Sequence, residues 1–393
     1  MNQWIDQIWK RASAAERTVL GAISGTSMDG VDLALCRIRG AGSQTELDIL
    51  HYAEKEIPPQ VLLPLREAAF LPTTTVETMV GLEVQLSRAW SHLITEMLND
   101  WDVDPSTVDL IGSHGQTLFH RPDREGDTDA TIQLVDGDRL TRAIGIPVIH
   151  DFRQAMIAAG TEGAPLAPLG ESLLYRHSTE PRILLNLGGI GNVTLLPAGE
   201  IGSGAAPIPF ATDTGPANTL IDEAVRRLYP GRSYDKDGAL ARRGTVIPAL
   251  LERLEAHPFF TEPTPKSTGQ EQFHWSWVHQ NVLELSLDPA THDLLATLTE
   301  LTARTVLLTI PSDWRRRVKD LYIGGGGWKN RYLIERLEAN WPGVRCKSIQ
   351  EAGVEPESKE AALFALLANE RISGPGWVTS EGVHVTPGKI SLP

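Results

Sequence analysis

The segment Gly25 to Asp32, which reads Gly-Thr-Ser-Met-Asp-Gly-Val-Asp, constrains the fold of this chain more than any other. It separates two apolar runs, residues 18–23 and 31–35, and this pattern predicts a strand, a tight turn and a second strand. Small residues, hydroxyls and carboxylates in such a turn can approach a polyphosphate closely and hold a hydrated magnesium ion. The segment has no Walker A lysine and no helical pattern follows it, which argues against a P-loop. We therefore interpret it as a phosphate-binding turn rather than an ordinary hairpin.

Length and charge narrow the possible classes of protein. A chain of 393 residues exceeds the size at which one core usually divides, so we expect two domains or lobes. A formal net charge of −14 argues against nucleic acid or an anionic membrane surface as the main partner. An anionic substrate would then need a local positive pocket.

Cysteine content and apolar runs bear on location. The two cysteines, Cys36 and Cys346, fit a reducing cytoplasm and exclude a disulfide scaffold or a cysteine metal cluster. No apolar run is long enough to span a membrane. The first nine residues lack a long apolar core, so we expect no signal peptide there. The spacing of Trp4, Ile5, Ile8 and Trp9 instead predicts a short amphipathic helix that packs on the body of the protein.

The strand–turn–strand pattern occurs twice. Residues 182–196 repeat it around Gly188 and Gly189, and residues 109–116 and 320–327 each read as a buried strand that ends in a glycine loop. The order hairpin, glycine loop, hairpin, glycine loop predicts two related α/β lobes. Helical patterns cover 75–98, 218–228, 289–308 and 358–368, with Asp288 as the cap of the third and Pro289 in its first position, while 258–273 reads as a surface loop.

A series of blocks, taken in chain order, resembles the anhydro-N-acetylmuramic acid kinase family of the actin, hexokinase and Hsp70 ATPase superfamily. The similarity extends from about residue 18 to residue 368, and many blocks in the right order are far more specific than one. The blocks are residues 25–32, 112–117, 151–153, 163–166, 186–190, 213–216, 234–238, 266–269 and the glycine run that begins at Gly324.

The resemblance implies a two-lobed actin-like ATPase (ribonuclease H-like) α/β fold, with duplicated lobes and a central cleft. Residues 18–150 would form lobe I, completed by 374–393, and residues 151–373 would form lobe II, with 1–17 as an N-terminal extension. The implied activity uses ATP and Mg²⁺: water opens the 1,6-anhydro ring of the sugar, and the released O6 is phosphorylated. The product is N-acetylmuramic acid 6-phosphate, in peptidoglycan recycling. The family also implies a cytoplasmic homodimer.

Each block carries candidate site residues. The first turn would hold the β- and γ-phosphates, with Asp29 or Asp32 positioning magnesium through water. A second turn would close over the phosphates from the other lobe, and a glycine run would accommodate the adenosine. The predicted ATP-binding residues are Gly25, Thr26, Ser27, Met28, Asp29, Gly30, Val31, Asp32, Asn186, Gly188, Gly189, Gly324, Gly325, Gly326 and Gly327. The predicted sugar-binding residues are His114, Gln116, Arg153, Gly163, Ala164, Pro165, Asp213 and Thr214.

Three of the predicted sugar-binding residues also have ordinary structural interpretations. Arg153 can hold the muramic carboxylate bidentately or form a structural salt bridge. His114 can touch the sugar or be a satisfied structural histidine. Asp213, like Asn218, can cap a helix, although the match of its block favours a role in the cleft.

The chain departs from the family pattern at the position of the catalytic base. The family has an aspartate three residues after the arginine of Asp-Phe-Arg, the presumed base for the attacking water, and this chain has Met156 there. A thioether cannot accept that proton, and general-base assistance is typically worth about 10²–10⁴-fold in rate. Glu162, in the next block, is the candidate substitute base. Three hypotheses remain: Glu162 replaces the base, the substrate is a sugar that needs no ring opening, or the protein binds nucleotide and sugar without turnover.

Other departures indicate a divergent member. Gln270 stands where the family has arginine, Trp328-Lys329 replaces Ala-His, and Ala217 replaces a glycine. Two other classes of function stay open. An actin-like nucleotide switch would hydrolyse ATP slowly whether or not anhydrosugars are present, and a phosphatase of the same superfamily would release phosphate without a nucleotide.

Overall fold

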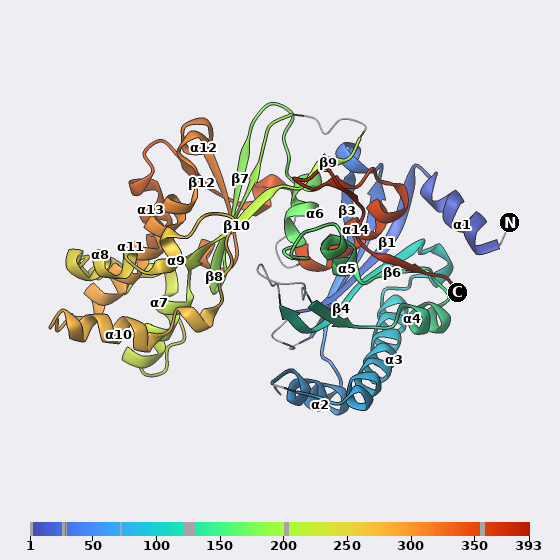
Figure 1. Ribbon diagram of the computed structural model, residues 1–393, viewed down its shortest axis with the longest axis horizontal. Coiled ribbons are helices and arrows are strands. Elements are labelled where there is room, and N and C mark those ends of the chain that lie inside the picture. Colours follow the sequence, from blue (N-terminus) through green and yellow to red (C-terminus); the bar gives the residue numbers. More distant parts are fainter. Residues whose placement is uncertain are drawn as a thin grey trace. The chain divides into compact units, whose positions relative to one another are not determined.

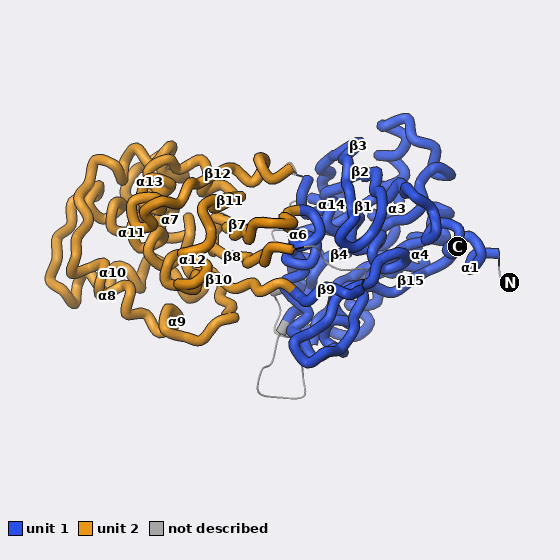
Figure 2. The backbone as a smooth tube through the Cα atoms, turned by 90° about the horizontal axis from the view of Figure 1, so that it is seen from above, with its two compact units in different colours: residues 1–174, 200–208, 357–393 blue, residues 175–199, 209–356 orange. Residues whose placement is uncertain are grey.

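The computed structural model describes residues 3–25, 28, 30–70, 73–121, 130–199, 204–353 and 358–393. Three residues of the predicted phosphate turn, Thr26, Ser27 and Asp29, lie outside the described residues. The chain forms two compact units (Figures 1 and 2). Unit 1 comprises residues 1–174, 200–208 and 357–393, and unit 2 comprises residues 175–199 and 209–356.

Unit 1 is built on a mixed sheet of order β15-β6-β4-β1-β2-β3, with β5 paired to β4. The hairpin predicted around Gly25 is confirmed: β1 and β2 are antiparallel and pair from Glu16 with Arg39 to Ile23 with Asp32. β3 is antiparallel to β2, while β4 is parallel to β1 and β6 is parallel to β4. The strands are β1 (Glu16–Ser24), β2 (Val31–Arg39), β3 (Glu46–Lys55), β4 (Leu110–Arg121), β5 (Ala130–Leu134), β6 (Val148–His150) and β15 (Lys389–Ser391).

Helices cover both faces of this sheet. Successive side chains of a strand point to opposite faces, so Leu20 packs in one core with Trp90 of α3, and Val19 packs in another with Phe364 of α14. Gly21 and Gly112 allow the backbone of α14 to approach β1 and β4 closely. The helices of unit 1 are α1 (Gln3–Ala12), α2 (Pro59–Phe70), α3 (Val76–Asp100), α4 (Gly137–Ile144), α5 (Phe152–Ala158), α6 (Ala167–Leu174) and α14 (Lys359–Ser373); a small sheet adds β9 (Ala206–Pro207), β13 (Trp377–Val378) and β14 (His384–Val385).

Unit 2 contains a five-stranded sheet of order β10-β8-β7-β11-β12. The second predicted hairpin is confirmed, because β7 and β8 are antiparallel around residues 188–189. The strands are β7 (Arg182–Leu187), β8 (Ile190–Leu196), β10 (Phe210–Pro216), β11 (Asp320–Gly324) and β12 (Arg345–Ser348). The helices are α7 (Thr219–Leu228), α8 (Pro248–Glu255), α9 (Pro258–Thr261), α10 (Trp275–Glu284), α11 (Thr291–Thr309), α12 (Ser312–Arg317) and α13 (Arg331–Asn340).

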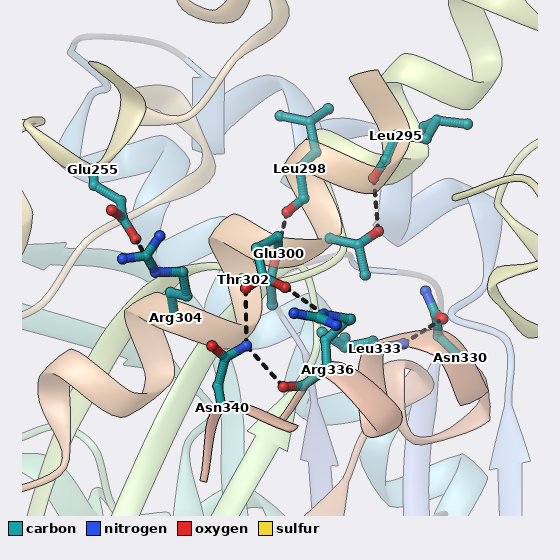
Figure 3. Close-up of polar contacts among 11 residues, drawn as sticks. Glu255, Leu295, Leu298, Glu300, Thr302, Arg304, Asn330, Leu333, Arg336 and Asn340 are labelled. Atoms are coloured by element: carbon teal, nitrogen blue, oxygen red, sulfur yellow. Dashed lines mark hydrogen bonds and ion pairs between the residues drawn. The ribbon is translucent and has the colours of Figure 1, made fainter. Parts of the chain in front are cut away.

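Helix α11 joins the two cores of unit 2. Its C-terminal half packs against the sheet through Val306, and its N-terminal half packs through Leu298 into a separate helical core. The buried carboxylate of Glu300 on α11 accepts hydrogen bonds from Arg336 Nε at 2.6 Å and Asn340 Nδ2 at 2.9 Å, both on α13 (Figure 3). These bonds fix α13 on α11, and α13 follows the glycine run.

The two sheets share one topology. In each, a central strand (β1 or β7) pairs on one side with an antiparallel strand (β2 or β8), which pairs in turn antiparallel with a further strand (β3 or β10). On its other side, the central strand pairs with a parallel strand (β4 or β11), which pairs in turn parallel with the last strand (β6 or β12). The order β3-β2-β1-β4-β6 in unit 1 therefore corresponds to β10-β8-β7-β11-β12 in unit 2. This is the duplicated ribonuclease H-like α/β fold that the family resemblance implies.

The unit boundaries differ from the predicted lobes. Residues 151–174 and 357–373 belong to unit 1 rather than to the second lobe, because α14 packs directly on β1, β2 and β4 and α6 packs on α14. The predicted N-terminal extension forms α1, whose Ile8 joins the α14 core, and its end joins β1. Residues 374–393 lie in unit 1, where β15 pairs with β6.

Three local predictions are wrong. Strand β4 continues through the expected glycine loop to Arg121, since its pairing with β1 resumes after a register shift between Ala22 and Ser24. Helix α11 starts at Thr291, with Ala290 as its N-cap and no cap from Asp288. Residues 258–273 are more than a surface loop, because the rings of Phe259 and Phe273 are buried in the helical core. In the part of the chain that the structure describes, no helix is both long and apolar enough to cross a membrane.

Candidate functional site

The turn between β1 and β2 is held by its neighbours. The Gly25 carbonyl accepts a hydrogen bond from the Met28 N–H at 3.2 Å and another from Gln116 Nε2, on β4, at 3.1 Å. The Met28 side chain is buried in the core beneath α2 and α3, and its carbonyl accepts from Arg66 Nη2 at 3.1 Å. The two described turn residues Gly25 and Met28 are thus held from inside by the core around the Met28 side chain and from the side by Gln116 and Arg66.

The remaining residues of this segment have distinct surroundings. Val31 is buried, and a Cβ on Gly30 would lie 3.0 Å from the Lys55 carbonyl oxygen of β3. Asp32 begins the pairing of β2 with β1, and its Oδ1 accepts a hydrogen bond from Tyr52 Oη at 2.6 Å. Gly30 and Val31 therefore serve packing, whereas Asp32 presents an oriented carboxylate at the base of the turn.

Three buried polar atoms near this turn have no hydrogen-bond partner among the residues that the structure describes. They are Ser24 Oγ, Ser113 Oγ and Gln116 Oε1, on residues that are at most 2% exposed. Ser24 lies opposite Gln116 in the β1–β4 register, so two of the three are neighbours. Buried polar groups are nearly always paired, and unpaired ones mark a water or ligand position. Sequence reasoning missed Ser24 and Ser113, although both lie beside or within its motif blocks.

His114 and Arg153 form a buried pair in unit 1. Arg153 Nε donates to His114 Nε2 at 3.1 Å, and His114 Nδ1 lies 3.3 Å from the Gly115 carbonyl oxygen, so the geometry requires the Nδ1–H tautomer. The imidazole ring stacks at a tilt on Phe364 of α14, with centroids 4.7 Å apart. Burial, and then the charge of Arg153, lower the pKa of His114 to about 3, so the ring is neutral at physiological pH.

The guanidinium of Arg153 is the buried cation of this site. Burial lowers its pKa to about 10, so it stays charged at neutral pH. Arg153 Nη1 donates to the Gly163 carbonyl at 3.1 Å, and no carboxylate among the described residues lies within ion-pair distance of it. The structural salt bridge considered from the sequence is therefore absent within the described ranges. A buried cation whose polar partners are neutral is suited to an anionic ligand.

The loop that follows α5 supports this pair. The Met156 carbonyl accepts from Thr161 Oγ1 at 2.8 Å and so closes the loop. Gly163 has φ +69°, a conformation that favours glycine, and its carbonyl is the one bound by Arg153. Ala164 and Pro165 are joined by a cis peptide bond immediately afterwards. Among the predicted sugar residues, His114, Arg153 and Gly163 thus lie together.

Met156 and Glu162 occupy different environments. The Met156 side chain is 4% exposed and packs with Phe152, one helical turn earlier, in the core beneath α14. Glu162 is half-buried in the loop, directly before the glycine that Arg153 binds. Position 156 therefore serves packing in this chain, while the loop carries a carboxylate beside the Arg153 contact.

The turn of unit 2 is braced by the start of α7. Asn218 Nδ2 donates to the carbonyls of Leu187 at 2.9 Å and Gly188 at 2.8 Å, and the Thr219 N–H donates to the Gly189 carbonyl at 3.2 Å. A Cβ on Gly189 would lie 2.5 Å from Gln270 Nε2, so the Gln270 amide lies directly against this turn. Asn218 precedes α7 but makes no side-chain cap bond; it fixes the turn instead.

The glycine run after β11 packs on the end of β7. Gly325 has φ +78°, and a Cβ there would lie 2.7 Å from both Asn186 Oδ1 and the Leu187 carbonyl oxygen. A Cβ on Gly327 would meet the Leu187 side chain at 2.5 Å, whereas Gly326 faces open space. The predicted ATP residues of unit 2, Asn186 and the runs 188–189 and 324–327, therefore lie close together.

Asp213 and Thr214 lie on β10. The Asp213 carboxylate accepts from the Thr268 N–H at 2.9 Å, and burial raises its pKa to about 6 despite this bond. The helix-capping interpretation of Asp213 is wrong, because the residue is inside a strand that pairs with β8. Thr214 is buried, with its Oγ1 against Gly191 of β8.

Comparison with known proteins identifies the family. The sequence model of the anhydro-N-acetylmuramic acid kinase family matches residues 17–382. The chain belongs to the anhydro-N-acetylmuramic acid kinase family. It is 36% identical to the anhydro-N-acetylmuramic acid kinase of Pseudoalteromonas atlantica over 100% of both chains. It is also 36% identical to that of Caldanaerobacter subterraneus, over 99% of this chain and 100% of that protein, and 35% identical to that of Bacillus cereus, over 90% and 92%.

Membership of the anhydro-N-acetylmuramic acid kinase family confirms the resemblance inferred from the motif blocks. The match begins in β1 and extends past α14, so it covers the five strands that the two sheets have in common and every motif block described above. The alignment with the kinase of Pseudoalteromonas atlantica covers 100% of both chains, so it includes both units.

Proposed function

We propose that this chain is an ATP-dependent kinase that opens the ring of 1,6-anhydro-N-acetylmuramic acid with water and phosphorylates O6. The product would be N-acetylmuramic acid 6-phosphate, an intermediate of peptidoglycan recycling. The observation that carries the proposal is the pair of sheets with one topology, each bearing a braced turn, in a chain that matches the kinase family from residue 17 to residue 382. A duplicated core of this kind lets each unit supply one phosphate-binding turn.

The ATP residues in this proposal are those of the two turns and the glycine run. The Gly25 turn would bind phosphate oxygens, Gly188 and Gly189 would do so in unit 2, and Gly324 to Gly327 would accept the adenosine. Mg²⁺ bound with ATP would neutralise phosphate charge. Asp32 suits this ion, because a single oriented carboxylate near a phosphate turn fits an ion held mostly by water and phosphates. The described residues hold no group of three or more His, Cys, Asp or Glu side chains that could form a protein cage for a metal.

Arg153 is the main sugar-binding residue in this proposal. In a chain of net charge −14, an anionic sugar needs a local cation, and the buried Arg153 guanidinium has neutral partners in the described part of the chain. Its fork would bind the muramic carboxylate bidentately. Because His114 accepts from Arg153 Nε and is buried, its role would be to orient the guanidinium rather than to touch the sugar.

Glu162 is our proposed base for the attacking water. Met156 is held in the core by Phe152 and α14, so a swing of its side chain into a polar site would expose apolar surface. Glu162 lies on a loop that is closed by Thr161 and anchored by Arg153. A carboxylate one residue from the Arg153 contact would take the proton of the water as it attacks the anomeric carbon.

The experiment that tests this function measures ADP release with and without the sugar. We expect ADP formation to depend on 1,6-anhydro-N-acetylmuramic acid and on Mg²⁺. Slow ATP hydrolysis that the sugar does not change would favour a nucleotide switch instead. Phosphate release from sugar phosphates without any nucleotide would favour a phosphatase. The proposal also includes a cytoplasmic homodimer, which light scattering of the purified protein would test.

A further inference from the structure

We propose that Arg66 on α2 is a further phosphate-binding residue, which contacts the phosphate chain of the nucleotide held at the β1–β2 turn. The inference rests on the proposed function, because it takes this turn as the phosphate site. It adds a side chain from outside every motif block, and it supplies the local positive charge that an acidic chain needs there.

Helix α2 holds Arg66 at the edge of the turn. Val61, Leu65 and Ala68 of α2 are buried in the same core as Met28, so helix and turn share one packed base. Arg66 lies one helical turn from Leu62 and Ala69, which are partly buried at the rim of that core. The side chain therefore starts at the boundary between core and surface, and its guanidinium reaches the turn, where Nη2 donates to the Met28 carbonyl at 3.1 Å.

Most of the hydrogen-bonding capacity of Arg66 is unused within the described part of the chain. A guanidinium carries five N–H donors in a planar fork, and the bond to Met28 uses one of them. Among the described residues, no carboxylate forms an ion pair with Arg66, and the residue is exposed. Other arginines of this unit, such as Arg39 and Arg139, pair with acidic neighbours. Arg66 is thus an anchored cation whose charge has no protein counterpart in the described part of unit 1.

A phosphate is the ligand class that this arrangement suits. One edge of the fork is fixed by a turn carbonyl, which leaves the other edge to bind two oxygens of one anion. A purely structural tie to Met28 would need only one neutral donor. The positive charge is therefore the property that separates a phosphate contact from a structural one.

The test compares nucleotide binding by the full-length protein and four variants, using titration calorimetry with ATP, ADP and adenosine in the presence of Mg²⁺. Arg66→Gln keeps a donor and loses the charge, Arg66→Lys keeps the charge and loses the fork, and Arg66→Ala loses both. Arg88→Gln, an exposed arginine of α3, is the matched control.

We expect Arg66→Gln and Arg66→Ala to weaken ATP binding by about 10-fold to 100-fold. Adenosine binding should be unchanged, and Arg66→Lys should recover part of the loss.

Salt provides an independent readout. The dependence of the ATP dissociation constant on ionic strength should be shallower in Arg66→Gln than in wild type or Arg88→Gln, because one screened attraction is lost. ATP affinity in Arg66→Gln equal to that in Arg88→Gln would overturn the inference while leaving the proposed function intact. Equal losses for ATP and adenosine would also overturn it, in favour of a structural role. Failure of the wild-type protein to bind ATP would instead overturn the proposed function.

Discussion

His114 is neutral because of where it lies, and this has a consequence for acid stability. Its folded pKa of about 3 is below the ordinary value of 6.5, so between these values the unfolded chain binds a proton that the native state does not. Stability contributed by neutral His114 is therefore complete above pH 6.5 and is lost as the pH falls toward 3, by up to about 1.4 kcal/mol per pH unit. We predict that His114→Gln, which can still accept from Arg153, flattens the decline in unfolding free energy below pH 6.5.

Urea unfolding at several pH values between 4 and 7 measures this effect. His92→Gln, an exposed position on α3, is the control and should leave the slope unchanged. An identical slope in His114→Gln and wild type would contradict the assignment of His114 as a buried neutral acceptor.

Glu162 is the residue on which the chemistry of ring opening depends in this account. Glu162→Gln keeps the size and polarity of the side chain and removes its ability to take a proton. We predict a fall in kcat of about 10²–10⁴-fold with little change in the ATP dissociation constant. Steady-state rates with saturating ATP and sugar measure the change in kcat. Glu180→Gln, at an exposed position of unit 2, should behave as wild type; equal activity of the two variants would remove Glu162 from the mechanism.

Single residues also show which parts of the candidate site can be predicted from the sequence and which cannot. Met156 and Glu162 follow from the family resemblance, but their environments depend on packing that the motif blocks do not contain. The burial of Met156 against Phe152 and α14 needs residues about 200 positions away. Ser24 and Ser113 went unnoticed, since an unpaired buried hydroxyl is visible only in three dimensions.

Among the helices and strands, the close packing of α14 on the first sheet is the feature that we expect to be most sensitive to mutation. A Cβ on Gly112 would collide with the Phe364 carbonyl of α14. Because this is a contact with backbone and not with a flexible side chain, β4 or α14 would have to shift to relieve it. We predict that Gly112→Ala destabilises the protein by about 1–3 kcal/mol or more. Gly81→Ala lies inside helix α3, where the new Cβ meets no described atom within 4 Å beyond its own stretch of helix, so it is the matched control and should stabilise the protein by about 0.5–1 kcal/mol. Chemical denaturation measures both, and a neutral Gly112→Ala would contradict the packing described.

Local elements were predictable and their partners were not. Both hairpins follow from apolar runs on either side of short glycine turns, because the signal lies within about fifteen residues. The continuation of β4 past Gly115 was not predicted, since it depends on pairing with β1 and β5. Phe259 and Phe273 are buried for the same kind of reason: an aromatic cluster with α10 outweighs a local composition of proline, threonine and glycine.

At the scale of the whole molecule, duplication is the central fact. The repeated pattern of the sequence predicts two related lobes, and five strands of the first sheet have the same order and pairing directions as the five strands of the second. The boundaries were misplaced because α14, near the end of the chain, returns to the first sheet, and a contact across more than 300 residues leaves no local signal.

The most direct test of the central claim is the mass of the product formed from 1,6-anhydro-N-acetylmuramic acid, ATP and Mg²⁺. We expect a product heavier than the sugar by one water and one phosphoryl group, formed together with one ADP, and lost in Glu162→Gln. An unchanged sugar under conditions where the protein binds ATP, or a product that gains a phosphoryl group without water, would contradict it.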